Sequence, residues 1–144
     1  MSVREQLQGA AEPYLRQGET VQVIFTGQTA SPLVGAAVMN GGLIGGLIEG
    51  AAGGNRLRIF VVTTQRILVL DAPMPRGLTW TVKRTDVVAE LPRSTRLGPP
   101  SGLWYKIPVD GKRVRVHRRR FAQIREADRL APESPWIPSG ATPG

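Results

Sequence analysis

The chain of 144 residues contains no cysteine and only one histidine, His117. The absence of cysteine excludes disulfide bonds and thiolate chemistry, and a lone histidine cannot supply the donor set of a zinc site. The sequence also lacks a phosphate-binding glycine loop, a dinucleotide fingerprint and the G-x-S-x-G motif of serine hydrolases. We therefore expect a protein that is not an enzyme and that binds no metal or cofactor.

The N-terminal residues have no apolar run behind a basic start, so they do not read as a secretory signal. The lack of cysteine fits a reducing compartment. Together these features predict a cytoplasmic protein.

Acidic residues are scarce where basic residues are dense. The net charge is +8, and residues 111–129 alone hold eight Lys or Arg against two Asp or Glu. The first 110 residues hold eleven against eight, so the excess of positive charge is local. A local basic surface favours an anionic partner, such as lipid headgroups, nucleic acid or an acidic protein.

A hairpin at residues 58–72 is expected to organise the fold. Two apolar runs, residues 59–62 and 67–70, flank the polar break at residues 63–66. Both runs are too short for helices and are rich in Val and Ile, which is typical of strands. They are apolar at successive positions, so we expect this hairpin to be covered on both of its faces.

Further elements follow from periodicity and turn chemistry. Residues 3–17 are predicted to form a helix, with Ser2 and Glu5 at capping-box spacing and Pro13 ending or kinking it. Residues 118–130 are predicted to form an amphipathic closing helix. Asp110-Gly111 favours a two-residue hairpin turn. The remaining predicted strands are residues 21–26, 78–83, 87–91, 103–109 and 112–117. Alternation predicts Val87, Ala89 and Leu91 on one face, and Val114 and Val116 facing inward with Arg113, Arg115 and His117 outward. The closing helix is expected to carry one apolar stripe of Phe121, Ile124, Ala127 and Leu130.

This pattern predicts a mainly β, α+β fold: a seven-stranded antiparallel barrel or sandwich that is capped by the C-terminal helix and preceded by a short N-terminal helix. The expected organisation is an N-terminal helix at residues 1–18, a barrel domain at 19–130 and a disordered proline-rich tail at 131–144.

A glycine-rich apolar segment interrupts the pattern at residues 31–54. Its single charged residue is Glu49, and no charge lies between Glu19 and Glu49, so we call it the uncharged segment. Its glycines recur every fourth residue with aliphatic residues between them, which on a helix gives one flat face and one aliphatic face. Such a helix suits lipid or a packing partner better than water. The alternatives are a membrane-inserting segment, an oligomer contact and an apolar loop over the barrel mouth. The candidate residues are Gly42, Leu43, Ile44, Gly46, Leu47, Ile48 and Gly50.

Three strings resemble a known family. TTQRILVLDA (63–72), LPRSTRLGPPSGLWYKI (91–107) and VHRRRF (116–121) are similar to strings in small actinobacterial proteins with a bacterial pleckstrin-homology-like (PH-like) domain. The resemblance covers about residues 19–130. The chain departs from the family's hairpin motif at Thr64-Gln65, where Asp-Arg is expected, and the glycine-rich insert is unusual. The resemblance implies a PH-like fold and a binding or scaffold role.

The densest basic cluster gives the candidate anion- or lipid-binding residues. They are Arg113, Arg115, His117, Arg118, Arg119 and Arg120, with Arg56 and Arg58 at the base of the uncharged segment. Cations at the first turn of a helix interact unfavourably with the positive end of the helix dipole. A bound anion would offset this unfavourable interaction. The structural alternative is a charged edge strand that blocks aggregation.

These features support three hypotheses. The first is a non-enzymatic binding module, peripheral at the inner membrane face, that meets anionic lipid or a membrane protein through the basic cluster and the uncharged segment. The second is a homo-oligomeric scaffold that packs through its glycine face. The third and weakest is nucleic-acid binding through residues 112–120.

Overall fold

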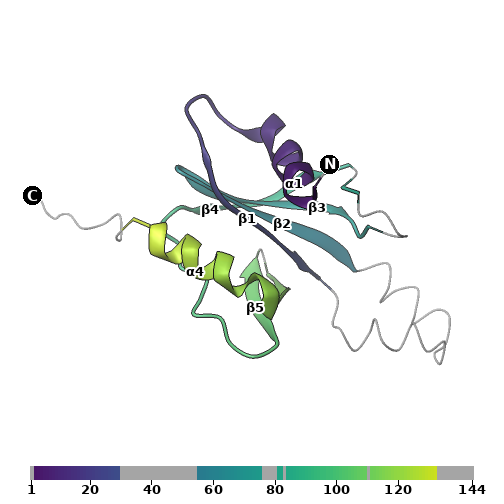
Figure 1. Ribbon diagram of the computed structural model, residues 1–144, viewed down its shortest axis with the longest axis vertical. Coiled ribbons are helices and arrows are strands. Elements are labelled where there is room, and N and C mark those ends of the chain that lie inside the picture. The colour runs from purple at the N-terminus through teal and green to yellow at the C-terminus, as the bar shows by residue number, and fades with distance from the viewer. Residues whose placement is uncertain (1, 30–54, 76–80, 83, 110, 133–144) are drawn as a thin grey trace, which may run out of the picture.

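The computed structural model describes residues 2–29, 55–75, 81–82, 84–109 and 111–132. These residues form a mainly β, α+β structure in which a six-stranded antiparallel sheet curls into a half-barrel (Figure 1). The order of strands in the sheet is β4-β3-β2-β1-β6-β5. The elements are α1 (Val3–Ala11), η1 (Glu12–Tyr14), β1 (Val21–Gln28), β2 (Arg56–Thr63), β3 (Arg66–Pro73), β4 (Asp86–Pro92), β5 (Trp104–Val109), β6 (Lys112–His117), η2 (Arg118–Arg120) and α4 (Phe121–Leu130).

The central hairpin is confirmed. β2 and β3 pair from Arg56 opposite Pro73 to Val62 opposite Ile67, and both strands are interior strands of the sheet. Their apolar side chains are buried at successive positions because helices cover both faces of the sheet. Figure 1 shows α1 on one face and α4 on the other.

The sheet therefore has a core on each face. The larger core contains Phe25 stacked on Phe60, with ring centroids 4.7 Å apart, and it receives Phe121, Ile124 and Ala127 of α4. The smaller core packs Leu7 and Ala11 of α1 against alternate residues of β2 and β3. The predicted apolar stripe of the closing helix is thus confirmed.

Both terminal helices differ from the prediction in length. The Ser2–Glu5 capping box is present, but α1 ends at Ala11, and a 3₁₀ turn carries Pro13. Proline lacks the N–H and the backbone freedom that a continuing helix needs, so the predicted extension to residue 17 was wrong. The segment predicted to open the closing helix, residues 118–120, is a separate 3₁₀ turn.

Two strand predictions need correction. The strand predicted at residues 78–83 is not formed at Thr81 or Val82, while the other four positions lie outside the described residues. Six strands, rather than the predicted seven, are therefore found in the described part of the chain. In β4, a register shift opposite Val69 and Leu70 breaks the expected alternation. Val87 is 43% exposed as a result, and Val88 packs on the larger core in its place.

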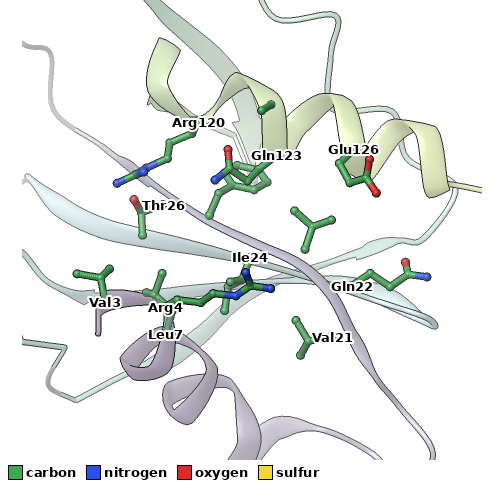
Figure 2. A pocket seen from close by; sticks show the side chains of 13 residues that line it. Val3, Arg4, Leu7, Val21, Gln22, Ile24, Thr26, Arg120, Gln123 and Glu126 are labelled. Atoms are coloured by element: carbon green, nitrogen blue, oxygen red, sulfur yellow. The ribbon is translucent and has the colours of Figure 1, made fainter. Parts of the chain in front are cut away.

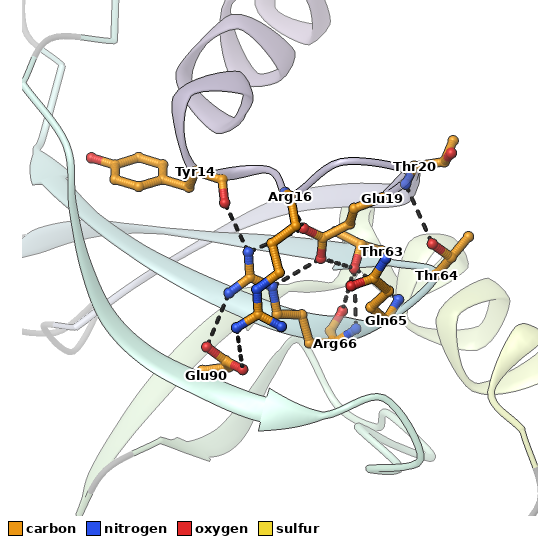
Figure 3. Close-up of polar contacts among 9 residues, drawn as sticks. All are labelled: Tyr14, Arg16, Glu19, Thr20, Thr63, Thr64, Gln65, Arg66 and Glu90. Atoms are coloured by element: carbon orange, nitrogen blue, oxygen red, sulfur yellow. Dashed lines mark hydrogen bonds and ion pairs between the residues drawn. The ribbon is translucent and has the colours of Figure 1, made fainter.

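A buried polar network ties the N-terminal segment to the turn of the central hairpin (Figure 3). Arg66 donates from Nε to Glu19 Oε2 at 2.9 Å and from Nη2 to Glu19 Oε1 at 3.0 Å. Thr63 donates its hydroxyl to Glu19 at 2.6 Å, and the Tyr14 carbonyl accepts from Arg66 at 2.8 Å. The Arg66 guanidinium lowers the pKa of Glu19 from 4.5 to about 2. Glu19 and Arg66 were not singled out from the sequence.

Candidate functional site

The basic residues of β6 and η2 converge on one hollow of about 410 Å³. We call it the basic hollow and define it by Arg115, His117, Arg119 and Arg120. No Asp or Glu contributes to its lining among the described residues. Four of the six clustered basic residues predicted from the sequence therefore meet at one place.

Strand alternation gives β6 two different faces. Val114 and Val116 are fully buried in the larger core, so Arg115 and His117 lie on the opposite face. Trp104 of β5 pairs with His117 of β6. The two rings pack edge to face, with their centroids 4.9 Å apart. This half-buried tryptophan forms an apolar wall of the hollow.

The remaining two arginines of the hollow are brought in by the turn after β6. The Arg119 N–H donates to His117 Nδ1 at 3.1 Å, so the histidine side chain caps η2. This cap bends the chain at the end of β6, and Arg119 and Arg120 then line the hollow together with Arg115. His117 was predicted only as a candidate anion-binding residue at a strand end, and its role as a cap was not predicted.

The other two clustered residues lie outside the hollow's lining. Arg113 is exposed on β6 opposite Pro108, two residues before Arg115 on the same face. Arg118 is exposed at the start of η2. Both add positive charge around the hollow without forming its wall.

Arg56 and Arg58 both form ion pairs with the carboxylate of Asp71. Arg56 donates from Nη2 to Asp71 Oδ2 at 2.7 Å and from Nε to Oδ1 at 3.1 Å, and Arg58, 8% exposed, is also ion-paired to Asp71. The hydrogen bonds from Arg56 and the charges of both guanidinium groups lower the pKa of Asp71. Leu57, between the two arginines, contributes to the hollow's lining. The two arginines themselves do not line the hollow, since alternation along β2 puts their side chains on the face opposite Leu57, and Asp71 compensates much of their charge.

The hollow lies at the base of the uncharged segment. β1 meets β6 at Gln28, which pairs with Arg115, and Arg115 donates to the Thr29 carbonyl at 3.0 Å. Thr29 and Asn55 flank residues 30–54, and the Thr29 N–H donates to the Arg56 carbonyl at 3.1 Å. The seven candidate residues of the uncharged segment, Gly42 to Gly50, lie outside the described residues.

A glycine, Gly27, allows β1 and β6 to come into contact. A Cβ at Gly27 would lie 2.7 Å from Val114 Cγ1 and 3.0 Å from the Arg115 carbonyl oxygen. Only a residue without a side chain allows β6 to approach β1 so closely. Gly27 therefore sets the position of Arg115 beside Thr29.

The arrangement is suited to holding an anion by charge and hydrogen bonding. Three guanidinium groups supply donors in fixed planar geometry, which suits phosphate and carboxylate groups. Within the described ranges, no three Asp, Glu, His or Cys side chains gather as metal ligands. None of the helices that the structure describes is long and apolar enough to cross a membrane.

No family model, no curated protein and no solved structure matches this chain. The resemblance to PH-like domains therefore remains a prediction from the sequence.

Proposed function

We propose that this chain is a non-enzymatic PH-like binding module that associates with the inner face of the membrane. In this proposal the basic hollow takes an anionic headgroup while the uncharged segment enters the apolar layer. The pairing of Gln28 with Arg115 carries the proposal, because it sets the base of residues 30–54 beside the hollow.

Two contributions to membrane affinity, one from basic residues and one from apolar side chains, are combined in this proposal. Basic residues near an anionic surface each contribute about 1 kcal/mol to membrane association. Apolar side chains add affinity by leaving water, and stable anchoring takes both kinds of signal. Leu43, Ile44, Leu47 and Ile48 supply the apolar signal in the sequence.

The PH-like fold is supported by the arrangement of elements. An antiparallel sheet curls around a core, and an amphipathic C-terminal helix packs against its inner face. The turn of residues 116–121 from the last strand into that helix is one of the three strings that resemble the family. A fold of this kind hosts many functions, so the site and not the fold carries the proposal.

Co-sedimentation with vesicles tests the proposal. The full chain, a variant lacking residues 35–53 and the double variant Arg115→Glu/Arg119→Glu are compared on neutral vesicles and on vesicles with 30% anionic lipid. The matched control is Arg84→Glu/Arg125→Glu, which changes the net charge equally at exposed positions away from the hollow.

We expect the full chain and the control to pellet with anionic vesicles and both other variants to stay in solution. If all four proteins pellet equally, the hollow and the segment are not the membrane elements. If none pellets, the membrane proposal fails. Light scattering of Gly46→Leu then tests self-association, and salt-dependent retention of DNA tests the nucleic-acid alternative.

A further inference from the structure

One edge of β1 is left open by the sheet. β1 pairs with β2 from Val21 opposite Thr63 to Gln28 opposite Leu57. On its other edge it pairs with β6 only at Gln28. β6 ends at His117 and the chain turns into η2, so no described strand continues the ladder along β1. An open strand edge presents backbone donors and acceptors to any extended chain that reaches it.

The hydrogen-bond ladder identifies the groups on this edge. The Thr29 N–H donates to the Arg56 carbonyl on the β2 side, and pairing alternates along an antiparallel ladder, so Gly27 and Phe25 also face β2. The N–H and C=O groups of Ile24 and Thr26 therefore point the other way, toward the side on which Gln28 meets Arg115. They offer two donors and two acceptors in strand register.

These groups lie in a groove of about 480 Å³, which we call the β1 groove (Figure 2). α1 forms one wall with Leu7, and α4 forms the other with Ala122 and Gln123. The side-chain oxygen of Gln123 is buried and has no hydrogen-bond partner among the described residues. Such an oxygen is costly unless a donor reaches it, and a peptide N–H in the groove is a suitable donor.

The uncompensated charge of the β1 groove is positive. Arg4 of α1 and Arg120, the last residue of η2, contribute to the lining, and neither has an ionic partner among the described residues. The one acid in the lining, Glu126, is paired with Arg129 at 2.6 Å. An acidic ligand therefore complements the groove.

We propose that the β1 groove binds an extended acidic segment of a partner protein by strand addition. The segment's backbone pairs with Ile24 and Thr26, its apolar side chains pack between α1 and α4, and its carboxylates meet Arg4 and Arg120. About five or six residues suffice to follow the strand from Val21 to Thr26, at roughly 3.3 Å for each residue. The site is distinct from the basic hollow, although Thr26 and Arg120 line both.

The probe is a displayed library of random nine-residue peptides, selected on the immobilised full chain. The selected peptides are synthesised, and their affinities are measured for the full chain, for Arg4→Glu and for the matched control Arg125→Glu, whose exposed position on α4 lies outside the groove lining. Arg4 does not line the basic hollow, so its substitution separates this proposal from membrane binding. Amide hydrogen exchange then reports on β1.

We expect the selected peptides to be enriched in Asp and Glu, and to bind Arg4→Glu at least fivefold more weakly with no change for Arg125→Glu. Exchange of the Ile24 and Thr26 amides should slow at least tenfold on binding. Methylation of alternate backbone nitrogens in the peptide should abolish the effect. Failure to enrich any peptide overturns the proposal, and so do peptides without acidic bias or without protection of these two amides.

A further exchange measurement tests whether the chain's own C-terminal tail occupies the β1 groove. The chain's own residues 133–144 follow α4 and include Glu133 and the apolar pair Trp136-Ile137. If the Ile24 and Thr26 amides are already slow to exchange in the full chain and become fast when residues 133–144 are removed, the groove's ligand is this tail. That result overturns the proposal of a partner peptide.

Discussion

Glu19 and Arg66 are separated by 47 positions in the sequence, and they form a buried ion pair with two hydrogen bonds of 2.9 and 3.0 Å. The Glu19 side chain is fully inaccessible to solvent, and that of Arg66 is 9% exposed. The pair joins the segment after α1 to the turn of the central hairpin, and this contact fixes where β1 begins relative to β2 and β3.

Substitution Glu19→Gln should destabilise the fold most strongly at neutral pH. The pKa of Glu19 is lowered from 4.5 to about 2 in the folded state, so its stabilising effect is complete above pH 4.5 and is lost as the pH falls toward 2. The shift corresponds to about 3 kcal/mol of unfolding free energy at pH 7. Urea denaturation across pH 2–7 should show a loss of this size and a flatter acid dependence for the variant.

The control for that experiment is Glu12→Gln, at an exposed position in η1. It should leave the unfolding free energy within about 0.5 kcal/mol of the parent value. Some acid dependence should persist in Glu19→Gln, because the pKa of Asp71 is also lowered in the folded state. An unchanged pH profile in Glu19→Gln contradicts the assigned role of the pair.

Gly27→Ala should destabilise the fold, and Gly9→Ala should not. A Cβ at residue 27 meets Val114 Cγ1 at 2.7 Å, and β6 has to move to accommodate it, at a cost of about 1–3 kcal/mol. A Cβ at Gly9, inside α1, meets nothing within 4 Å and should stabilise the helix by about 0.5–1 kcal/mol. Thermal unfolding of both variants measures the contrast, and equal shifts of Tm would refute the close contact of β1 with β6.

Arg58→Gln and Arg119→Glu should have opposite consequences. Arg58 is 8% exposed and bound to Asp71, so its loss should lower the unfolding free energy by about 1–3 kcal/mol and leave vesicle binding at low temperature nearly unchanged. Arg119 is exposed in the basic hollow, so its reversal should weaken vesicle binding with little change of stability. A binding loss in Arg58→Gln without destabilisation would show that Arg58 contacts the ligand directly.

Binding of the full chain to anionic vesicles should fall steeply with salt. The Debye length shrinks from about 8 Å at 0.15 M to about 3 Å at 1 M, which screens the arginines of the hollow. The apolar contribution of residues 31–54 does not weaken in the same way. Co-sedimentation at 0.05, 0.15 and 0.5 M NaCl should therefore give a decreasing bound fraction, and salt-independent binding excludes the hollow as the headgroup site.

Several parts of the fold could be predicted because local chemistry dictates them. The successive apolar positions of residues 59–62 and 67–70 required a strand pair buried on both sides, and the structure has it. Ser2 and Glu5 formed their capping box, because both partners lie within one helical turn. The alternation of Val114 and Val116 with Arg115 and His117 predicted which side chains of β6 enter the core.

Other features depended on contacts between distant segments. The bulge at Val88 reversed the expected facing of Val87, and a single sequence carries no signal for such an insertion. The sequence does not distinguish Arg56 and Arg58 from Arg115. In the structure, Asp71 compensates the charges of Arg56 and Arg58 but not that of Arg115. The β1 groove had no sequence signal, since α1 and β1 come from the N-terminal part of the chain and α4 from its C-terminal part.

Residues close together along the chain dictate the apolar hairpin, the two terminal helices and the dense positive charge of residues 112–120, so these features could be predicted from the sequence. Which of those charges share one hollow, and which strand edge stays open, depends on contacts between segments far apart in the sequence. Both features follow from the contact of β1 with β6. Gly27 has no side chain, so β6 can approach β1 closely there, and the two strands pair only at Gln28.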